Sequence, residues 1–504
     1  MKYIDSFLNR ITMYRLALYY LIGLIIAAVV LAMLGYLSYN PVSIAVIAIY
    51  MVILCWITNE IFAYVYEAPT NFESSLITAL ILTLIITPVF STQSLVFLTA
   101  AGGLAISSKY ILAIRKKHIF NPAAVAVALT ALGAGQAASW WVGSLVLLPF
   151  VVVGGVLLVR KIKRSQMVIT FLLSVVVATV VYCLIGHTNV TSTLQKTVFH
   201  SSLFFLAFVM LTEPLTSPPT EAKQRWYGGL AGILFPPQVH ILSLYTTPEL
   251  VLVVSNAFAY IINPKVKLFP KLVQKLDLAP DTKDFIFAPD RDFTFKPGQY
   301  MEWTLPHAGR DNRGDRRYFT FASSPTEQNI RLGVKFYDHG SSFKRALLNM
   351  DQNSMISASQ LGGDFVMPAD TNRKLVFIAG GIGVTPFRSM IKYLIDTNTP
   401  RPITLLYSEK QASEVVYTDV FEAARKQLGI KTIYTLTDQG ITPPSWARAG
   451  IITADLIQVE VPDYLQSIFY ISGPHTMVTA MEDMLKGLGV PRSHIKIDFF
   501  PGYA

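Results

Sequence analysis

The stretch AGGIGVTP (residues 379–386) follows an apolar run that predicts a strand and precedes a run that predicts a helix. Glycines at such a turn let the backbone approach a pyrophosphate closely, and the positive end of the helix favours the charge of that group. The stretch therefore predicts a dinucleotide-binding turn, although a glycine-rich turn alone is weak evidence. Its candidate cofactor-binding residues are Gly380, Gly381, Gly383, Thr385 and Pro386.

Strand, turn and helix alternate around this turn, which predicts an α/β domain with a parallel sheet over residues 369–504. The runs that predict its strands are KLVFIAGG (374–381), ITLLYS (403–408), KTIYTLT (431–437) and SIFYISGP (467–474). Residues 276–368 instead alternate between apolar and polar side chains, as in DFIF (284–287), with a turn at KPGQ (296–299). That pattern predicts an antiparallel β-barrel of six strands.

Residues 1–263 differ from the rest of the chain because they are nearly continuous apolar runs. Hydrophobic residues make up 52% of the 504 residues and charged residues only 15%, which is too apolar for a single soluble enzyme. Because about 18 or more consecutive apolar residues read as a membrane-spanning helix, we expect an α-helical bundle of ten spans. The expected spans are 16–38, 42–63, 74–90, 93–114, 122–139, 142–160, 166–186, 197–212, 226–246 and 248–263. A basic, proline-containing linker, residues 264–275, follows.

The net charge of +10 comes partly from basic residues in short loops between the apolar runs, so we expect a membrane setting and no nucleic-acid partner. Ten spans place both termini on one side, and the loops on the opposite side carry almost no basic residue, Lys196 excepted. By the positive-inside rule, we expect an integral cytoplasmic-membrane protein with both termini in the cytoplasm. The two cysteines, Cys55 and Cys183, lie in apolar runs and cannot build a disulfide framework or a zinc site, so we expect no metal.

A second motif, RYFTFASS (317–324), lies about sixty residues before the glycine-rich turn. In this order and spacing, the two motifs resemble the flavin and nicotinamide halves of the ferredoxin–NADP reductase superfamily, and the resemblance covers residues 276–504. It implies an NAD(P)H-dependent FAD oxidoreductase. It also implies that Arg317 pairs with the flavin pyrophosphate, that Phe319 lies against the isoalloxazine, and that Thr320 lies near flavin N5, where the hydride arrives.

The same resemblance implies the remaining residues of the site. Ser472 stands where the family has the cysteine of a Cys-Gly-Pro-x-x-Met motif, and DFFPGY (498–503) resembles the tail whose aromatic side chain covers the flavin. The implied catalytic residues are Thr320, Ser472 and Phe500, although Phe500 could equally be a core residue. The implied cofactor-binding residues are Arg317, Tyr318, Phe319, Thr320, Ser323, Val334, Lys335, Gly340, Ser341, Ser342, Gly473, Pro474 and Met477, besides those of the glycine-rich turn.

The stretches KHIFNPAA (117–124) and LTEPLTSPPT (211–220) resemble the membrane subunits B of sodium-pumping NADH:quinone reductase and D of the Rnf complex, over about residues 20–263. This resemblance implies an electron-transfer domain in which Asn121, Thr212 and Glu213 line a non-covalent riboflavin or FMN. The loop QAASWW (136–141) lacks the family's flavin-attachment motif, so we expect no covalent flavin. A plainer alternative is that Asn121 only caps a helix and that Glu213 only ends one.

Both resemblances together imply a membrane flavoprotein that passes electrons from cytoplasmic NAD(P)H through FAD to a flavin or quinone in the membrane domain, and so across the membrane. One alternative is an ion or riboflavin transporter with a regulatory reductase module. Another is a haem-containing, ferric-reductase-like protein that uses His200 and His240, although the chain lacks the two histidine pairs such proteins need. The choice of NAD or NADP is open, because SEK (408–410) offers both an acid and a base. The acceptor, ion coupling and partner subunits are open as well.

Overall fold

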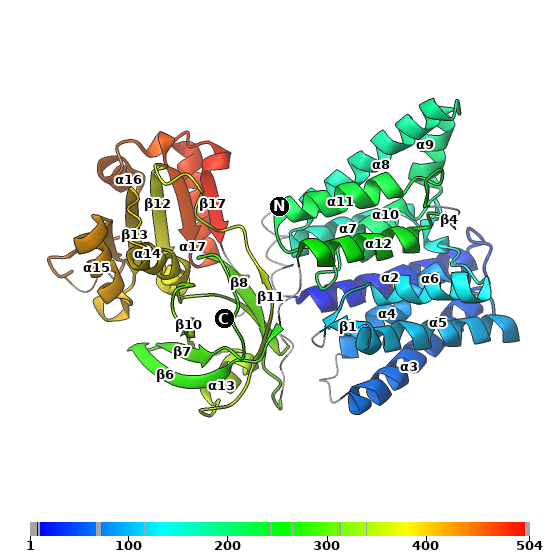
Figure 1. Ribbon diagram of the computed structural model, residues 1–504, viewed down its shortest axis with the longest axis horizontal. Helices are drawn as coiled ribbons and strands as arrows, with labels where there is room; N and C mark the ends of the chain where they lie inside the picture. The colour runs from blue at the N-terminus through cyan, green and yellow to red at the C-terminus, as the bar shows by residue number, and fades with distance from the viewer. Residues whose placement is uncertain are drawn as a thin grey trace. The chain divides into compact units, whose positions relative to one another are not determined.

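The computed structural model describes residues 8, 11–66, 72–114, 117–241, 244–263, 267–309, 311, 314–338, 340–438, 440 and 442–498. The chain divides into two compact units, Met1–Lys265 and Val266–Ala504. The first unit is helical, and the second contains β-sheets with flanking helices (Figure 1). The expected order of a helical half and a sheet-containing half is therefore confirmed.

The first unit is a bundle of apolar helices that lie side by side (Figure 1). Its helices are α2 (Met13–Met33), α3 (Pro41–Val65), α4 (Phe72–Ile85), α5 (Thr92–Ile111), α6 (Pro122–Ala134), α7 (Leu148–Ile162), α8 (Ser165–Ile185), α9 (Val190–Phe199), α10 (Leu203–Phe205), α11 (Glu221–Leu234) and α12 (Pro248–Ile262). Helices α3 and α6 begin at asparagine caps followed by proline: the Asn40 side chain accepts hydrogen bonds from Val42 N and Ser43 N, and the Asn121 side chain accepts one from Ala124 N.

Among the described residues, four helices are long and apolar enough to cross a bilayer, namely α2, α3, α5 and α8. Helices α4, α6 and α12 are apolar but have only 14, 13 and 15 residues. Side chains such as Leu173 and Val177, on α8, are each 62% exposed, as expected for a surface that faces lipid. The count of ten spans stays a prediction.

The predicted spans differ from the helices in their bounds, as three examples show. The fifth ends at Ala134, because Gly135 adopts a left-handed conformation with φ 65°. The eighth is divided into the end of α9, α10 and a π-helix, η2 (Leu206–Met210). The ninth ends at Leu234, and a short hairpin of β3 (His240–Ile241) and β4 (Leu244–Tyr245) follows, since two prolines after Phe235 cannot continue the helix.

Helices α8 and α11 pack with unusually close backbones. A Cβ atom placed on Gly228 would collide with the carbonyl oxygen of Met167, and one on Gly232 would lie 2.5 Å from the carbonyl oxygen of Phe171. Two glycines four residues apart on one helix face permit this approach, which is the usual way for helices to associate in a membrane. The GGLAG run (228–232) therefore fixes the position of α11 against α8.

Antiparallel strands form the first part of the second unit. They are β5 (Lys267–Leu268), β6 (Lys271–Ala279), β7 (Thr282–Ala288), β8 (Tyr300–Thr304), β9 (Arg316–Thr320), β10 (Ile330–Lys335) and β11 (Ser357–Gly362), with the helix α13 (Ser342–Leu348) between the last two. The described strands form two sheets, in the orders β10-β7-β6 and β5-β11-β8-β9, and closure into one barrel stays a prediction. The expected linker contains strand β5 and the first half of β6. These residues form strands because Leu268 and Leu272 are buried in the apolar core of the antiparallel part.

The last part of the second unit is a six-stranded sheet in the order β15-β14-β13-β12-β16-β17, in which every pairing is parallel. Its elements are β12 (Leu375–Gly380), α14 (Thr385–Asp396), β13 (Ile403–Glu409), α15 (Thr418–Leu428), β14 (Lys431–Leu436), β15 (Ala447–Ala449), α16 (Ala454–Glu460), β16 (Ile468–Ser472), α17 (His475–Gly487) and β17 (Ile495–Asp498). All four predicted strands are confirmed. Strand order reverses between β12 and β16, and ligands of open α/β sheets bind beyond the carboxyl ends of strands at such a point.

Candidate functional site

The glycine-rich turn follows β12 and packs against the turn that follows β16. A Cβ atom on Gly380 would collide with Met477, and one on Gly383 would lie 2.5 Å from the carbonyl oxygen of Ser472. A Cβ atom on Gly473 would lie 3.1 Å from the carbonyl oxygen of Gly380. The structure thus brings two predicted nicotinamide motifs, ninety residues apart, to the point where the strand order reverses.

Residues of the glycine-rich turn have the conformation expected for a phosphate-binding turn. Gly381 has φ +57°, which L side chains rarely adopt, and a 3₁₀ turn, η3 (Gly381–Val384), leads into α14. Thr385 and Pro386 form the first turn of α14, where the Thr385 hydroxyl donates to the carbonyl oxygen of Ile382 at 3.2 Å. The helix that the sequence predicts after this turn is therefore present, with its N-terminus at the turn.

Glu409, the last residue of β13, lies beside this turn. A Cβ atom on Gly381 would be 4.0 Å from both carboxylate oxygens of Glu409. The Tyr407 hydroxyl donates to Glu409 at 3.2 Å, and Lys335 Nζ lies 3.7 Å from Glu409 and 2.5 Å from Glu414. Burial raises the pKa of Glu409 to about 7. The sequence indicates Glu409 only as one group bearing on the choice of NAD or NADP; its place over the turn comes from the structure.

The flavin motif lies on β9 and is largely buried. Arg317 is 8% exposed, and its guanidinium lies 5.3 Å from the ring centre of Phe343, on α13. The ring of Phe319 lies 6.0 Å from the same ring, and the Tyr318 hydroxyl donates to Glu302 at 2.9 Å. The structure therefore groups the predicted cation and the predicted stacking aromatic around one phenylalanine.

Thr320 joins the flavin motif to the last strand of the parallel sheet. Its hydroxyl donates to a carboxylate oxygen of Asp498 at 3.3 Å. Asp498 pairs with Ser472 across β17 and β16, and Ser472 in turn pairs with Ala379 on β12. Two of the three predicted catalytic residues, Thr320 and Ser472, are thus linked through Asp498. The third, Phe500, lies outside the described residues.

The predicted second phosphate site lies at the start of α13. Ser341 caps this helix by accepting a hydrogen bond from Lys344 N at 3.3 Å, and Gly340 N donates to the carbonyl oxygen of Tyr337. Ser342 N donates to the Asp311 carboxylate at 2.8 Å. The other predicted binding residues lie elsewhere. Val334 is buried in the apolar core, and the carbonyl oxygen of Ser323 accepts a hydrogen bond from Ser389, in the other part of the second unit. Pro474 is the N-terminal cap residue of α17.

In the first unit, the predicted flavin-lining residues bind one another. Asn121 donates to Glu213 at 2.9 Å, and the other carboxylate oxygen of Glu213 lies 3.2 Å from His118 Nε2. The Thr216 hydroxyl donates to Glu213 at 3.2 Å, and the Thr212 hydroxyl donates to a carbonyl oxygen of its own helix. The family resemblance implies that Asn121 and Glu213, 92 residues apart, lie on one face beside a flavin. The structure brings the two side chains into contact, and the flavin stays a prediction.

A further buried chain of polar groups extends from Asn121 to α12 and from there to α11. Asn121 N donates to the side chain of Asn256 at 2.8 Å, and Asn256 donates to the Tyr227 hydroxyl at 2.8 Å. The sequence did not indicate Asn256 or Tyr227, because an isolated polar residue in an apolar run has no partner in sequence. His200 and His240, the haem candidates, are both exposed.

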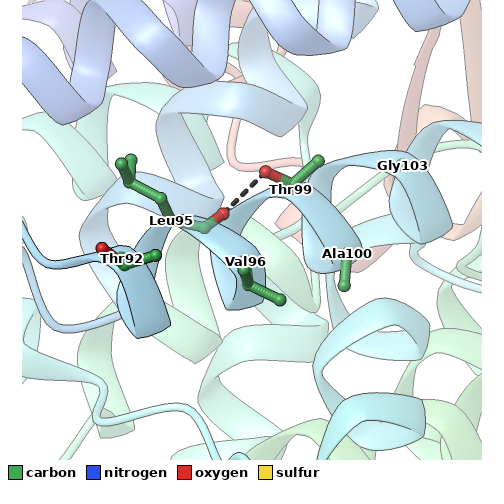
Figure 2. A pocket seen from close by; sticks show the side chains of 6 residues that line it. All are labelled: Thr92, Leu95, Val96, Thr99, Ala100 and Gly103. Carbon is green, nitrogen blue, oxygen red and sulfur yellow. Dashed lines mark hydrogen bonds between the residues drawn. The ribbon is translucent and has the colours of Figure 1, made fainter.

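A shallow hollow of about 480 Å³ lies on α5 (Figure 2). Its lining residues share one face of that helix: Thr92, Leu95, Val96, Thr99, Ala100 and Gly103. The Thr99 hydroxyl donates to the carbonyl oxygen of Leu95 at 2.6 Å, as Figure 2 shows. Because no predicted site residue lines the hollow, it is separate from the groups described above.

Two family models match parts of the chain. The model of the NQR2, RnfD, RnfE family matches residues 132–264, and the model of the oxidoreductase NAD-binding domain matches residues 377–483. The first match lies in the helical unit and the second in the parallel sheet. Both resemblances that the sequence indicated are therefore confirmed, and the helical unit is a membrane domain.

Curated relatives match less than half of this chain. Oxidoreductase NAD-binding domain-containing protein 1 of Bos taurus is 30% identical over 231 residues, which cover 41% of this chain and 71% of that protein. The flavohemoprotein of Bacillus cereus is 25% identical over 226 residues, which cover 41% of this chain and 53% of the relative. This chain thus spans about half the length of that flavohemoprotein.

Among solved structures, the flavohem-like FAD/NAD-binding domain of nitric oxide dioxygenase from Vibrio cholerae is similar to this chain. The sequence identity is 20% and the TM-score 0.42, with 46% of this chain and 98% of that chain covered.

Proposed function

We propose a function on the premise that this chain belongs to the NAD(P)H-dependent FAD oxidoreductases of the ferredoxin reductase type and carries a membrane domain of the NQR2, RnfD, RnfE family. The second unit takes electrons from NAD(P)H, and the first unit delivers them to an acceptor within the membrane. The single observation that supports this most is the meeting of Thr320, Asp498 and Ser472, because it joins the flavin motif to the nicotinamide turn.

The residues present fit both nucleotides. The glycines at 380, 383 and 473 let the two turns pack against each other without side chains between them. At Gly381 the nearest atoms to an added Cβ are the Glu409 oxygens at 4.0 Å, so the backbone there is open to a pyrophosphate. The buried Arg317 supplies a planar cation beside aromatic rings, which suits a flavin nucleotide. Bound FAD supplies the capacity to accept a hydride from the nicotinamide and to release electrons singly.

The chain's own residues then orient the reaction. Arg317, Tyr318 and Phe319 would hold the flavin from β9, with Ser341 and Ser342 at the start of α13. Thr320 would present a hydroxyl to the flavin, and its hydrogen bond to Asp498 fixes the direction of that hydroxyl. Lys335, Gly381, Gly383 and Pro474 would hold the dinucleotide, with Ser472 beside them. A flavin-covering role for Phe500 rests on the sequence resemblance alone, because Phe500 lies outside the described residues.

In the membrane unit, we place the acceptor near Asn121, Thr212 and Glu213, as a non-covalent riboflavin or FMN or a docked quinone. Support comes from the family model over residues 132–264 and from the buried polar groups around Glu213, because ionisable residues inside a membrane domain mark functional sites by default. The same residues satisfy each other, so a bound carrier has to replace hydrogen bonds that the structure shows.

Ten spans with both termini in the cytoplasm place the nicotinamide site in the cytosol, as the distribution of basic residues indicates. Reporter fusions test this arrangement directly. Fusions after Ser91, Ser139 and Thr193 should report outside, and fusions after Lys117, Lys163 and Lys223 should report inside. One clean inversion among the six contradicts the span count.

The function itself is tested on purified full-length protein in detergent, with NAD(P)H oxidation followed with a lipid-soluble quinone or a soluble dye as acceptor. We expect FAD reduction in both cases and sustained turnover with the quinone. Extraction of flavins from the same sample should yield FAD and a second, non-covalent flavin. If FAD is the only flavin and quinone supports no turnover, the route through the membrane unit is wrong, although the reductase assignment stands.

A further inference from the structure

The two parts of the second unit are held together by a buried polar junction, which we define as Asp284, Glu327, Arg388, Ser389 and Tyr417. Arg388 and Ser389 lie in the second turn of α14, immediately after the glycine-rich turn. Asp284 lies on β7, Glu327 lies in the loop between β9 and β10, and Tyr417 precedes α15. The junction thus connects the element that begins at the nicotinamide turn with the segments next to the flavin motif.

Arg388 makes the most contacts in this junction. It is 4% exposed, and it donates to the carbonyl oxygen of Ala322 at 2.7 Å and to both carboxylate oxygens of Glu327, at 2.6 and 3.0 Å. Glu327 also accepts a hydrogen bond from Ser324 N at 2.7 Å. Burial alone would raise the pKa of Glu327, but the hydrogen bond and charge of Arg388 outweigh it and lower that pKa below its usual value. The pair is therefore ionised and bidentate.

The backbone segment held by this pair is the last part of the flavin motif, immediately after β9. Besides the Arg388 bond to Ala322, the Ser389 hydroxyl donates to the carbonyl oxygen of Ser323 at 2.6 Å. Ala322 lies two residues after Thr320, and Arg388 lies three residues after Thr385. The start of α14, at Thr385, therefore lies one helical turn before Arg388 and Ser389, which bind the backbone after β9.

Tyr417 makes the second connection. It adopts φ 60°, a strained conformation for a tyrosine, and its hydroxyl donates to Asp284 at 2.6 Å. The other oxygen of Asp284 accepts a hydrogen bond from Arg331 at 2.7 Å. Gly333, on β10, has no space for a side chain, because a Cβ atom there would lie 2.5 Å from the Tyr417 hydroxyl and 2.7 Å from Thr385.

Buried ion pairs contribute little net stability, because the cost of desolvating the charges offsets their attraction. In some proteins, buried polar contacts instead select one geometry, and this is the role that we assign to the junction. Hydride transfer depends steeply on geometry: reacting atoms must approach to about 3–3.5 Å, and a misplacement of about 1 Å costs on the order of 100-fold in rate. A rigid junction between two separately folded nucleotide sites is what such a reaction requires.

We propose that Arg388, Glu327 and Tyr417 are positioning residues that set the rate of hydride transfer to the flavin, and not the affinity for either nucleotide. This inference rests on the proposed function of the second unit. These residues contact the flavin motif only at the backbone of Ala322 and Ser324, and not at the side chains assigned to either nucleotide; they act through that backbone and through the position of α14.

The test uses the full-length protein with Tyr417→Phe and Arg388→Lys. The first removes one hydroxyl and keeps the ring, and the second keeps the charge and removes the bidentate contact. FAD content, the KM for NAD(P)H, the rate of FAD reduction in a stopped-flow instrument, and the isotope effect with 4-deuterated nicotinamide are measured. We expect FAD reduction to slow roughly 10- to 100-fold and the isotope effect to rise, with FAD content and KM within about twofold.

The matched control is Tyr470→Phe, which also removes the hydroxyl of a buried tyrosine. That hydroxyl donates to the carbonyl oxygen of Val366, and Tyr470 lies outside the junction. It should leave the rate of FAD reduction unchanged. A rise in KM without a slower reduction step overturns the proposal, and so does loss of FAD in both junction variants. If the unaltered protein shows no FAD reduction by NAD(P)H, the proposed function fails instead, which distinguishes the two outcomes.

Discussion

Polar groups are arranged differently in the two units. At the carboxyl edge of the parallel sheet, Gly381 leaves backbone uncovered by side chains, with Glu409 beside it and Lys335 3.7 Å from Glu409. In the helical unit, Asn121 and Glu213 face each other within the bundle and are satisfied by hydrogen bonds. Polar groups at the edge of a sheet can form hydrogen bonds with water until a ligand binds. Polar groups inside a helical bundle in lipid have no water available, so they have to form hydrogen bonds with one another.

This contrast predicts that substitutions in the sheet unit change nucleotide chemistry and that substitutions in the helical unit change stability first. The variants below test whether these two kinds of effect separate between the two units.

The largest effect is expected from Gly383→Ala. The added Cβ would lie 2.5 Å from the backbone carbonyl of Ser472 and 2.6 Å from Gly473, and backbone atoms cannot move aside cheaply. FAD reduction by NAD(P)H should slow at least about 100-fold in a stopped-flow measurement, while dithionite still reduces the bound FAD. Gly487→Ala, where nothing lies within 4 Å of the added atom, is the control. Unaltered reduction in Gly383→Ala would show that this turn does not bind the dinucleotide.

The next effect concerns Arg317→Ala, which removes the predicted partner of the flavin pyrophosphate. A charge-assisted hydrogen bond contributes about 1.5–3 kcal/mol, so FAD affinity should fall roughly 10- to 100-fold. The measurement is FAD fluorescence after dilution or dialysis of the purified protein. Arg291→Ala, which breaks only an exposed ion pair with Asp290, should keep its FAD. Normal flavin content in Arg317→Ala would remove this arginine from the site.

In the helical unit, Glu213→Ala should lower the free energy of unfolding by about 1–3 kcal/mol, because it leaves Asn121 and His118 without their shared acceptor. Thermal unfolding in detergent, followed by tryptophan fluorescence, measures this change. The rate of FAD reduction by NAD(P)H should stay the same. Glu221→Ala, at an exposed position on α11, should change neither quantity. A slower FAD reduction in Glu213→Ala would mean that the two units are not separable in this way.

The smallest effect is a pH dependence at Glu409. Its pKa is raised from 4.5 to about 7 by burial, so between these values the folded protein keeps a proton that the unfolded chain releases. The free energy of unfolding therefore falls as pH rises through this window. Glu409→Gln, which mimics the protonated form, should lose that dependence and become more stable than the unaltered protein near pH 8.

Thermal release of FAD, measured by its fluorescence between about pH 5 and pH 8, reports the difference. Glu422→Gln, an exposed glutamate on α15, is the control and should follow the unaltered protein at every pH. Parallel pH curves for Glu409→Gln and the unaltered protein would mean that Glu409 is already ionised in the folded state.

Local patterns predicted much of the second unit. The glycine-rich turn, its flanking strand and the helix after it are readable from AGGIGVTP because glycine, proline and the apolar run act on their own neighbours. The contact of Asn121 with Glu213 followed from a resemblance between families, not from spacing. The bounds of the helices were less accessible, because Gly135 and the prolines after Phe235 end helices inside stretches that are uniformly apolar.

The amino-acid sequence by itself determined that a membrane half precedes a flavin and nicotinamide half. The reason is that composition, strand rhythm, the aromatic motif RYFTFASS and the glycine-rich motif AGGIGVTP are local properties. Only the tertiary structure decided which side chains meet. Tyr417 and Asp284 are 133 residues apart, and Thr320 and Asp498 are 178 apart. Nothing in their own neighbourhoods marks them as partners, since strand order and register, not sequence spacing, bring distant residues to one edge of a sheet.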